Sequence, residues 1–310
     1  MVAMTDGTGS TGSPANWRGA ISAMNSLPPV IARLDDVSGS YSTILCDVWG
    51  VVHNGVRASQ PACEALIRAR AEGRAVVLVT NSPRPSAGVI AQLRGLGVPD
   101  EAYDRIVTSG DATRGLIAEG PRRVFHLGPE RDLPIYDGLD VECVEEYEAA
   151  AVVCTGLFDD DTETPDDYQE MLRRFRSRDL PFICANPDIV VEKGDRLIWC
   201  SGALARDYGQ MGGRTLISGK PHAPIYRMAF ARASQVLGHD VNVRDALAIG
   251  DGMATDIRGA VNFGVDALYV SGGIHFRDYG ATAAAPDHGR LAAFLAQQGM
   301  TPVAVIPQLV

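Results

Sequence analysis

The sequence contains no apolar run of the roughly 18 residues that a helix needs to cross a membrane. Its N-terminus also has no basic region followed by an apolar stretch, which is the pattern of a secretory signal. We therefore expect a cytoplasmic protein with no membrane partner.

Positive charge is scarce in this chain. It has 28 Lys and Arg residues against 38 Asp and Glu, which gives a formal net charge of -10. Affinity for nucleic acids comes chiefly from basic side chains that release phosphate counterions, so this balance argues against a nucleic-acid partner. A small phosphorylated molecule stays open, because a metal ion and one lysine can hold a single phosphate group.

Cysteine pairs of the C-x-x-C kind are absent as well. Several of the six cysteines stand in apolar, strand-like runs, which favours buried free thiols in a reducing compartment. The six are Cys46, Cys63, Cys143, Cys154, Cys184 and Cys200.

The 310 residues, 46% of them hydrophobic, are enough for a sizeable core. Residues 5–14 are rich in Gly, Ser and Thr, so we interpret residues 1–35 as a flexible leader. Beyond it, apolar strand-like runs alternate with helical segments. Strands are expected at 43–49, 75–80, 246–250 and 267–270, and helices from Ser59 to Gly73, at 85–96 and at 255–263.

Apolar strands that alternate with helices predict an α/β fold with a doubly wound, Rossmann-like parallel sheet. A second cycle of the same kind lies in the middle of the chain, with strands at 124–127, 149–154 and 181–185 and a helix opened by Thr164-Pro165. We therefore expect a core formed by residues 36–121 and 219–310. Residues 122–218 would form an inserted α/β cap domain that sets substrate specificity.

Polar residues follow several of the predicted strands. The first ends in Asp47-Val48-Trp49-Gly50-Val51 and the second in Thr80-Asn81-Ser82, whereas Gly219-Lys220-Pro221 follows the run at 215–217 and Gly250 to Asp256 end and follow the run at 246–250. Ligands of open parallel sheets bind at the carboxyl ends of the strands. Phosphoryl transfer needs this inventory of a nucleophile, carboxylates for a divalent cation, and donors for the remaining charge.

Each of these residues has a plainer interpretation when it is taken alone. Asp47 and Asp251 suit turns, Lys220 suits a surface loop, and Asp256 suits the first turn of a helix, where the dipole favours an acid. Their order and their shared position at strand ends favour a single site.

The order D-x-x-G-V, T-N-S, G-K-P and G-D-x-x-x-T-D resembles the four motifs of the haloacid-dehalogenase (HAD) superfamily. More narrowly, the chain is similar to the class IIA phosphatases, which include nucleotide, para-nitrophenyl phosphate and pyridoxal phosphate phosphatases. Residues 106–110, 185–188 and 200–204 support the narrower match. The resemblance covers residues 36 to 275 and includes a large cap between the second and third motifs.

The resemblance implies a role for each motif residue. Asp47 would attack phosphorus and become an aspartyl phosphate, with Lys220 neutralising the nucleophile and the transferring group. Magnesium (Mg²⁺) would be held by the carboxylates of Asp47 and Asp251 and by the main-chain carbonyl of Trp49. Asp256 would orient the waters of the metal or the lysine.

Phosphate oxygens would be bound by Thr80, by the adjacent Asn81 amide and by Lys220. The metal and the lysine together make a small phosphorylated metabolite the expected ligand. The resemblance also leaves a homodimer open.

Trp49 departs from the family pattern, because family phosphatases have a second aspartate at this position, which protonates the leaving group and then activates water. An indole has no proton to exchange near neutral pH, and such acid–base help typically contributes about a hundred- to ten-thousand-fold in rate. Phosphonoacetaldehyde hydrolases, P-type ATPases and dehalogenases also lack this aspartate. His53 lies close downstream and either supplies a proton or is merely solvated.

The leading hypothesis is a magnesium-dependent phosphatase or phosphotransferase. It would act on a sugar phosphate, nucleotide or aryl phosphate, with a preference for leaving groups that need little protonation. One alternative is a catalytically impaired protein of the same fold that binds a phosphorylated ligand. Another is a metal-free, dehalogenase-like hydrolase, which the additional carboxylate at Asp251 disfavours. We interpret the acidic run at residues 158–164 as a solvated loop.

Overall fold

The computed structural model describes residues 27–194, 196–280, 282 and 285–310, so most of the predicted leader lies outside the described residues. The end of that leader was wrongly predicted as flexible. Val30 bridges to Val305, the Ile31 N–H donates to the Val305 carbonyl over 2.9 Å, and Leu34 is fully buried. Packing against the last strand of the sheet therefore orders the chain from about residue 30.

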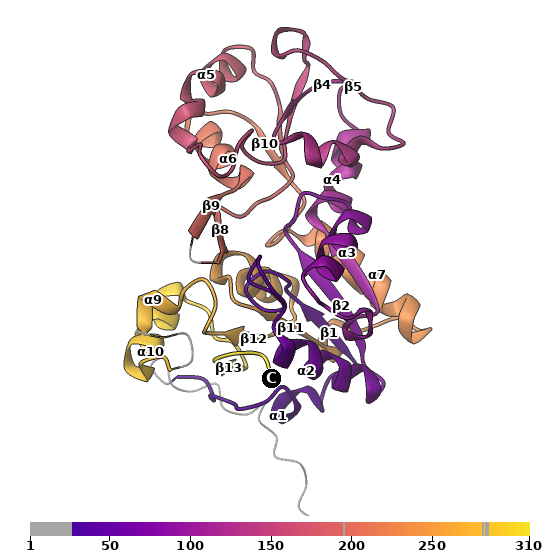
Figure 1. The fold of residues 1–310 in the computed structure, drawn as a ribbon, viewed down its shortest axis with the longest axis vertical. Helices are drawn as coiled ribbons and strands as arrows, with labels where there is room; N and C mark the ends of the chain where they lie inside the picture. The colour runs from indigo at the N-terminus through magenta and orange to yellow at the C-terminus, as the bar shows by residue number, and fades with distance from the viewer. Residues whose placement is uncertain (1–26, 195, 281, 283–284) are drawn as a thin grey trace, which may run out of the picture.

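The larger sheet has six parallel strands in the order β13-β12-β11-β1-β2-β3 (Figure 1). This order confirms the prediction of a doubly wound parallel sheet. The predicted strand at 43–49 is shorter than expected: β1 ends at Cys46, and the Asp47 N–H makes the last hydrogen bond to β11, to the Ile249 carbonyl over 2.8 Å. The strands are β1 (Thr43–Cys46), β2 (Ala75–Thr80), β3 (Arg105–Thr108), β11 (Ala246–Gly250), β12 (Asp266–Val270) and β13 (Ala304–Ile306).

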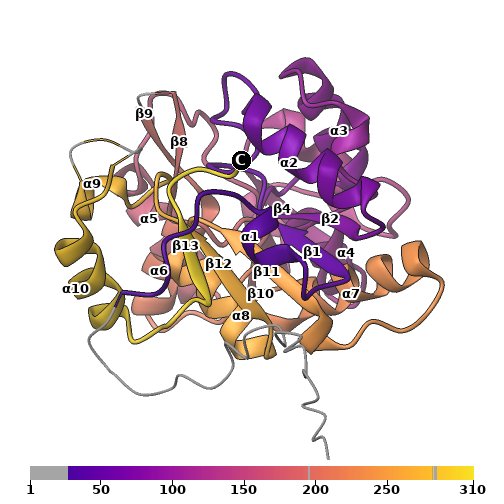
Figure 2. The same ribbon diagram turned by 90° about the horizontal axis from the view of Figure 1, so that it is seen from below.

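Helices cover both faces of this sheet, as the view from below shows (Figure 2). Alternate residues of one strand reach opposite cores: Ile44 packs with α2 (Gln60–Ala71) and α3 (Ser86–Gly95), whereas Leu45 packs with α7 (Ala223–Leu237). Burial on both faces explains why the strands read as continuous apolar runs. The other helices around this sheet are α1 (Asp35–Ser38), α4 (Ser109–Ala118), α8 (Arg258–Phe263), α9 (Phe276–Tyr279) and α10 (His288–Gln298).

The second sheet has five parallel strands in the order β10-β7-β6-β4-β5, and all of them lie within residues 123–217. Its core packs against α5 (Gln169–Ser177) and α6 (Ser201–Gln210). The predicted strands at 149–154 and 181–185 are each shorter in the structure. The strands are β4 (Arg123–Leu127), β5 (Glu142–Cys143), β6 (Ala151–Cys154), β7 (Phe182–Cys184) and β10 (Thr215–Ile217).

An antiparallel hairpin, β8 (Val190–Lys193) and β9 (Arg196–Trp199), extends from the second sheet towards the first (Figure 1). We call it the hairpin below. Short 3₁₀ turns complete the chain. They are η2 (Asp100–Ala102), η3 (Glu130–Tyr136), η4 (Glu146–Glu148), η5 (Pro165–Tyr168) and η6 (Val243–Asp245).

Two general expectations from composition can be compared with the described residues. None of the helices in the described part of the chain is long and apolar enough to cross a membrane. All six cysteines are free; five are buried as expected, whereas Cys143 is exposed at the end of β5.

Candidate active site

Four of the predicted site residues meet at the carboxyl edge of the larger sheet. The ammonium of Lys220 contacts the carboxylate of Asp47, and it donates to Asp256 Oδ1 over 2.6 Å and to the Val79 carbonyl over 3.0 Å. One carboxylate oxygen of each of Asp47, Asp251 and Asp256 lies within 4.8 Å of the other two. Residues far apart in sequence thus form one compact charged cluster.

The cluster is buried and carries excess negative charge. Lys220 is 4% exposed, and Asp47, Asp251 and Asp256 are each 6% exposed. Three carboxylates around a single ammonium leave uncompensated charge in a low-dielectric site, which is costly. A divalent cation would compensate that charge, and carboxylate oxygens are the ligands that Mg²⁺ prefers. The side chains therefore fit the predicted metal.

The pKa values of the cluster reflect this crowding. Burial, with repulsion from Asp256, raises the pKa of Asp47 well above its usual range, and the Lys220 ammonium only partly offsets this. Burial, again with repulsion from Asp256, raises the pKa of Asp251 to about 7. The Ile274 N–H donates to this carboxylate and opposes the rise. Burial alone would lower the pKa of Lys220, but its carboxylate neighbours outweigh it and keep the ammonium charged.

Gly50 explains how Asp251 can approach the loop after Asp47. Its φ is +84°, a left-handed conformation that residues with a side chain rarely adopt. A Cβ atom at this position would stand 2.2 Å from Asp251 Oδ2. The same carboxylate accepts the Ile274 N–H over 2.8 Å, so its position is determined from two sides.

Asp256 lies in a π-helical turn, η7 (Met253–Ile257), which precedes α8. The sequence predicts one regular helix from residue 255 to residue 263. In the structure the wider turn lets the Asp256 carboxylate accept the Gly252 N–H over 3.0 Å while it also holds Lys220. Such turns are frequent at functional sites.

Thr80 and Asn81, predicted to bind phosphate, differ in their availability. The Thr80 hydroxyl oxygen accepts the Ser82 N–H over 3.2 Å, so its own proton can still be donated. The Asn81 carboxamide accepts the Lys220 N–H over 2.8 Å and donates to Asp188 over 2.9 Å. Because that side chain is occupied, Asn81 would have to bind phosphate through its main-chain N–H.

Asp188 is a site residue to which the sequence assigned no role. It follows β7 in the second sheet, yet its carboxylate reaches Asn81 in the first. Burial raises its pKa to about 6, and the nearby Lys220 opposes the shift. The available signal was its place directly after a buried strand, inside the stretch 185–188 that resembles the family.

Trp49 does not stand free beside the nucleophile. Its indole N–H donates a hydrogen bond to the Glu192 carbonyl in β8, and its ring meets that of His53 edge-on at 4.9 Å between centroids. The side chain is half-buried. Residue 49 therefore connects the nucleophile's loop with the hairpin.

His53 is neither solvated nor suited to the role of proton donor. It is 3% exposed, and its Nδ1 accepts the Gly55 N–H over 2.9 Å. Burial lowers its pKa to about 4, so the ring is neutral near pH 7. Both interpretations of His53 from the sequence are therefore corrected by its burial.

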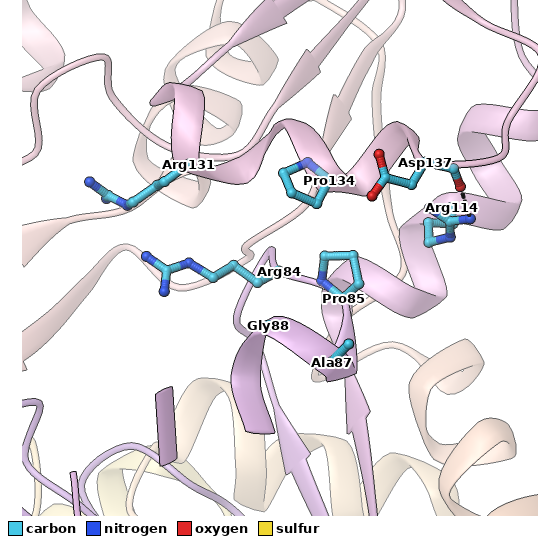
Figure 3. A pocket seen from close by; sticks show the side chains of 8 residues that line it. All are labelled: Arg84, Pro85, Ala87, Gly88, Arg114, Arg131, Pro134 and Asp137. Atoms are coloured by element: carbon cyan, nitrogen blue, oxygen red, sulfur yellow. Dashed lines mark hydrogen bonds between the residues drawn. The ribbon is translucent and has the colours of Figure 1, made fainter. Parts of the chain in front are cut away.

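A cavity of about 280 Å³ lies between α3 and η3 and is also lined by Arg114 of α4 (Figure 3). Its guanidinium groups are already engaged. Arg84 pairs with Asp132 over 3.2 Å, and Arg131 pairs with Asp160 in the acidic run at 158–164. Arg114 donates to the main-chain carbonyls of Ile135 and Asp137 over 2.7 and 2.6 Å. The contacts of Arg84 and Arg114 attach the middle segment of the chain to the loop before α3 and to α4.

Comparison with known proteins identifies the class of protein. Residues 44–142 match the haloacid dehalogenase-like hydrolases, and residues 217–294 match a second HAD-hydrolase-like family. A solved haloacid dehalogenase-like hydrolase from Brucella suis 1330 is 59% identical, with a TM-score of 0.83 over 91% of this chain and 100% of that chain. This chain therefore belongs to the haloacid dehalogenase-like family.

Two further relatives are more distant. A 5'-nucleotidase of Bacillus subtilis is 28% identical over 77% of this chain and 91% of its own. A possible sugar phosphatase from Cytophaga hutchinsonii is 20% identical, with a TM-score of 0.74 over 90% and 98% of the two chains. Within the family the chain is a class IIA member, a hydrolase of the HAD phosphatase type.

Proposed function

We propose that this protein is a Mg²⁺-dependent phosphatase or phosphotransferase that acts on a small phosphorylated metabolite through an aspartyl phosphate on Asp47. The observation that supports the proposal is the buried cluster in which Lys220 contacts Asp47. One carboxylate oxygen of each of Asp47, Asp251 and Asp256 lies within 4.8 Å of the other two. A nucleophile, an ammonium and carboxylates for a cation are the parts that phosphoryl transfer requires.

In the proposed reaction an Asp47 oxygen forms a bond to phosphorus, and the bond from phosphorus to the leaving oxygen breaks. Water, or another acceptor hydroxyl, then takes the phosphoryl group and regenerates the carboxylate. Lys220 stays charged throughout and neutralises the transferring group. Asp256 holds the ammonium against the nucleophile.

The Asp47 and Asp251 carboxylates and the Trp49 carbonyl would hold Mg²⁺, which when bound neutralises the charge of the phosphate oxygens. Thr80 can donate its hydroxyl proton to a phosphate oxygen, and the main-chain N–H of Asn81 is a second donor. Residues 122–218, which contain the whole second sheet, would serve as the cap that closes over this site and excludes water.

The substrate preference follows from the missing acid. Position 49 has no carboxylate, its indole proton is held by Glu192, and His53 is neutral. We infer a preference for phosphates with stable leaving groups, such as aryl and acyl phosphates, over simple alkyl esters. Sugar phosphates and nucleotides remain in the substrate class, in keeping with the names of the two distant relatives.

A second candidate function is supported by Trp49 itself. A protein that binds a phosphorylated ligand without turning it over would keep the metal cluster and could dispense with the acid. A metal-free, dehalogenase-like hydrolase has less support, because three clustered carboxylates are costly to bury without a cation.

The deciding experiment is a screen of phosphorylated metabolites and para-nitrophenyl phosphate at saturating MgCl₂, repeated in EDTA and after Mg²⁺ is restored. We expect turnover of aryl phosphate that EDTA abolishes and Mg²⁺ recovers. Mg²⁺-dependent binding of phosphate esters without turnover would instead favour the binding protein. Turnover that EDTA leaves unchanged would contradict the metal-dependent mechanism.

A further inference from the structure

The segment from Asp188 to Gly194 is attached to the core at three points. The Asp188 carboxylate accepts from Asn81 over 2.9 Å, the Glu192 carbonyl accepts from the Trp49 indole, and the Gly194 N–H donates to the Asn54 carbonyl over 3.1 Å. The first contact joins the residue before the hairpin to the end of β2. The other two join the hairpin to the loop that follows Asp47, residues 48–57, which we call the nucleophile loop.

Two of these contacts lie at the ends of neighbouring strands, close in sequence to the nucleophile. Asn81 follows β2 and Trp49 follows β1, and these two strands are paired neighbours. A segment attached to both must therefore cross the carboxyl ends of β1 and β2, where Asp47 lies. The hairpin consequently lies against the loop that follows Asp47, while Asp251 follows β11, which pairs with β1 on the side opposite β2.

The nucleophile loop is shaped to receive the tryptophan. Gly55 has a φ of +80°, and a Cβ atom there would lie 2.6 Å from the Trp49 ring and 3.4 Å from the Lys193 Cα. The ring is thus enclosed by the loop on one side and approached by the hairpin on the other. The buried ring of His53 supports it edge-on.

We propose that Trp49 is a positioning residue that docks the hairpin over Asp47, and that position 49 serves cap placement where family phosphatases use it for proton transfer. The role in turnover rests on the proposed phosphatase function; the docking itself does not. A docked hairpin forms one wall of the substrate site. Loosening it should therefore weaken substrate binding more than it slows the chemical step.

The first test is hydrogen–deuterium exchange of the hairpin amides in wild type, Trp49→Phe and Trp199→Phe. Phenylalanine keeps a ring but cannot donate, and the Trp199 indole makes no hydrogen bond to any described residue, so the second variant controls for lost bulk in the same region. We expect roughly three- to tenfold faster exchange in Trp49→Phe, the effect of one lost hydrogen bond. Trp199→Phe should stay near wild type.

Equal exchange in Trp49→Phe and wild type would overturn the proposal, as would equal loosening in both variants. If Trp49→Phe does not fold, the docking bond can still be tested in the wild-type protein. Exchange of the indole protons themselves can be followed there after ¹⁵N labelling. There we expect the Trp49 indole proton to exchange roughly three- to tenfold more slowly than that of Trp199. Similar rates would refute the docking bond.

The second test is steady-state kinetics on para-nitrophenyl phosphate with Mg²⁺. Trp49→Phe should raise KM roughly three- to tenfold with little change in kcat, because no proton donor is removed. A fall in kcat with KM unchanged would contradict a positioning role. If the wild-type protein has no turnover, the proposed function fails while the exchange experiment still decides whether Trp49 docks the hairpin.

Discussion

Asp47 carries the proposed chemistry, and its replacement by asparagine isolates that role. Asp47→Asn is nearly isosteric and removes only the nucleophilic charge, so we expect turnover to fall by about a thousandfold or more. The protein should remain folded, because Lys220 keeps Asp256 as a partner and one of three crowded carboxylates is neutralised. Turnover and melting temperature of the two purified proteins measure both effects.

Residual activity of Asp47→Asn within a few-fold of wild type would show that another group attacks phosphorus. A suitable control is Asp159→Asn, which neutralises an exposed carboxylate outside the cluster and should leave turnover unchanged.

As a proposed magnesium ligand, Asp251 should make magnesium binding depend on pH. Its pKa of about 7 means that near pH 6 most of the carboxyl is protonated, whereas near pH 8 most is ionised and able to bind a cation. We expect the affinity for Mg²⁺ to rise roughly tenfold between these pH values. The thermal shift caused by a fixed, subsaturating MgCl₂ concentration should rise accordingly.

The metal-free protein should show the opposite trend. At pH values above the pKa of an unfolded aspartate and below about 7, native Asp251 retains a proton that the same residue releases in the unfolded chain. The native state therefore binds more protons, and this residue's contribution to stability falls as pH rises through that window. Asp251→Asn is the control and should remove most of the Mg²⁺ shift at both pH values. A wild-type shift that is equal at pH 6 and pH 8 would contradict this account.

The sequence predicts individual residues well where one strand end decides their place. Asp47 and Asp251 meet because the paired parallel strands β1 and β11 bring their carboxyl ends to one edge. Lys220 follows β10 of the second sheet, and its ammonium reaches the same cluster from there. The bonds from Asn81 to Asp188 and from Trp49 to Glu192 could not be predicted. They join separate sheets, and their existence depends on how the two sheets are placed in space.

Helix α6 offers a test of how an element is fitted to the site. A Cβ atom on Gly202 would lie 2.2 Å from the Pro187 carbonyl oxygen, so Gly202→Ala must displace the chain next to Asp188. We expect a loss of about 1–3 kcal/mol in the free energy of unfolding. Turnover should fall as well, because Asp188 holds Asn81.

Gly209 lies in the same helix and provides the matched control. A Cβ atom there would meet nothing within 4 Å, and the residue is exposed. Gly209→Ala should be neutral or stabilise the protein by about 0.4–1 kcal/mol, with turnover unchanged. Urea denaturation and steady-state assays of the pair compare the two sites. If Gly202→Ala behaves like Gly209→Ala, close packing of α6 on this segment is unimportant.

Elements were predictable to different degrees for physical reasons. The runs at 75–80 and 246–250 match β2 and β11 because burial on both faces makes a strand apolar throughout. The run at 215–217 matches β10, an edge strand whose residues are only partly buried. The π-helical turn at Met253–Ile257 was missed, since its wider geometry follows from the bonds of Asp256 to Gly252 and Lys220 and not from local periodicity.

At the scale of the whole molecule, the middle segment is attached to the core on two sides. Arg84 and Arg114 contact it beside the cavity of Figure 3, while Asn81 bonds Asp188 and Trp49 bonds Glu192 of the hairpin. The sequence predicted two α/β units and the order of their segments. It could not predict this second attachment, because a tryptophan two residues after the nucleophile indicates only that the acid is missing.

Trp49→Asp tests both consequences of that attachment. On the proposed docking, the substitution should release the hairpin and weaken the binding of every substrate, but it also places a carboxyl group where family phosphatases have their acid. A general acid helps poor leaving groups more than good ones. We therefore expect kcat/KM for β-glycerol phosphate relative to that for para-nitrophenyl phosphate to rise by about tenfold or more.

Trp49→Asn is the matched control for this substitution, since it removes the same indole and adds a side chain of the same size that cannot transfer a proton. The ratio of the two kcat/KM values largely cancels the effect of undocking, so it should rise in Trp49→Asp and stay at the wild-type value in Trp49→Asn. Equal ratios in both variants would mean that a carboxyl group at position 49 does not reach the leaving oxygen. In that case the hairpin bond would be the whole contribution of this position, and substrate selection would depend on the cap alone.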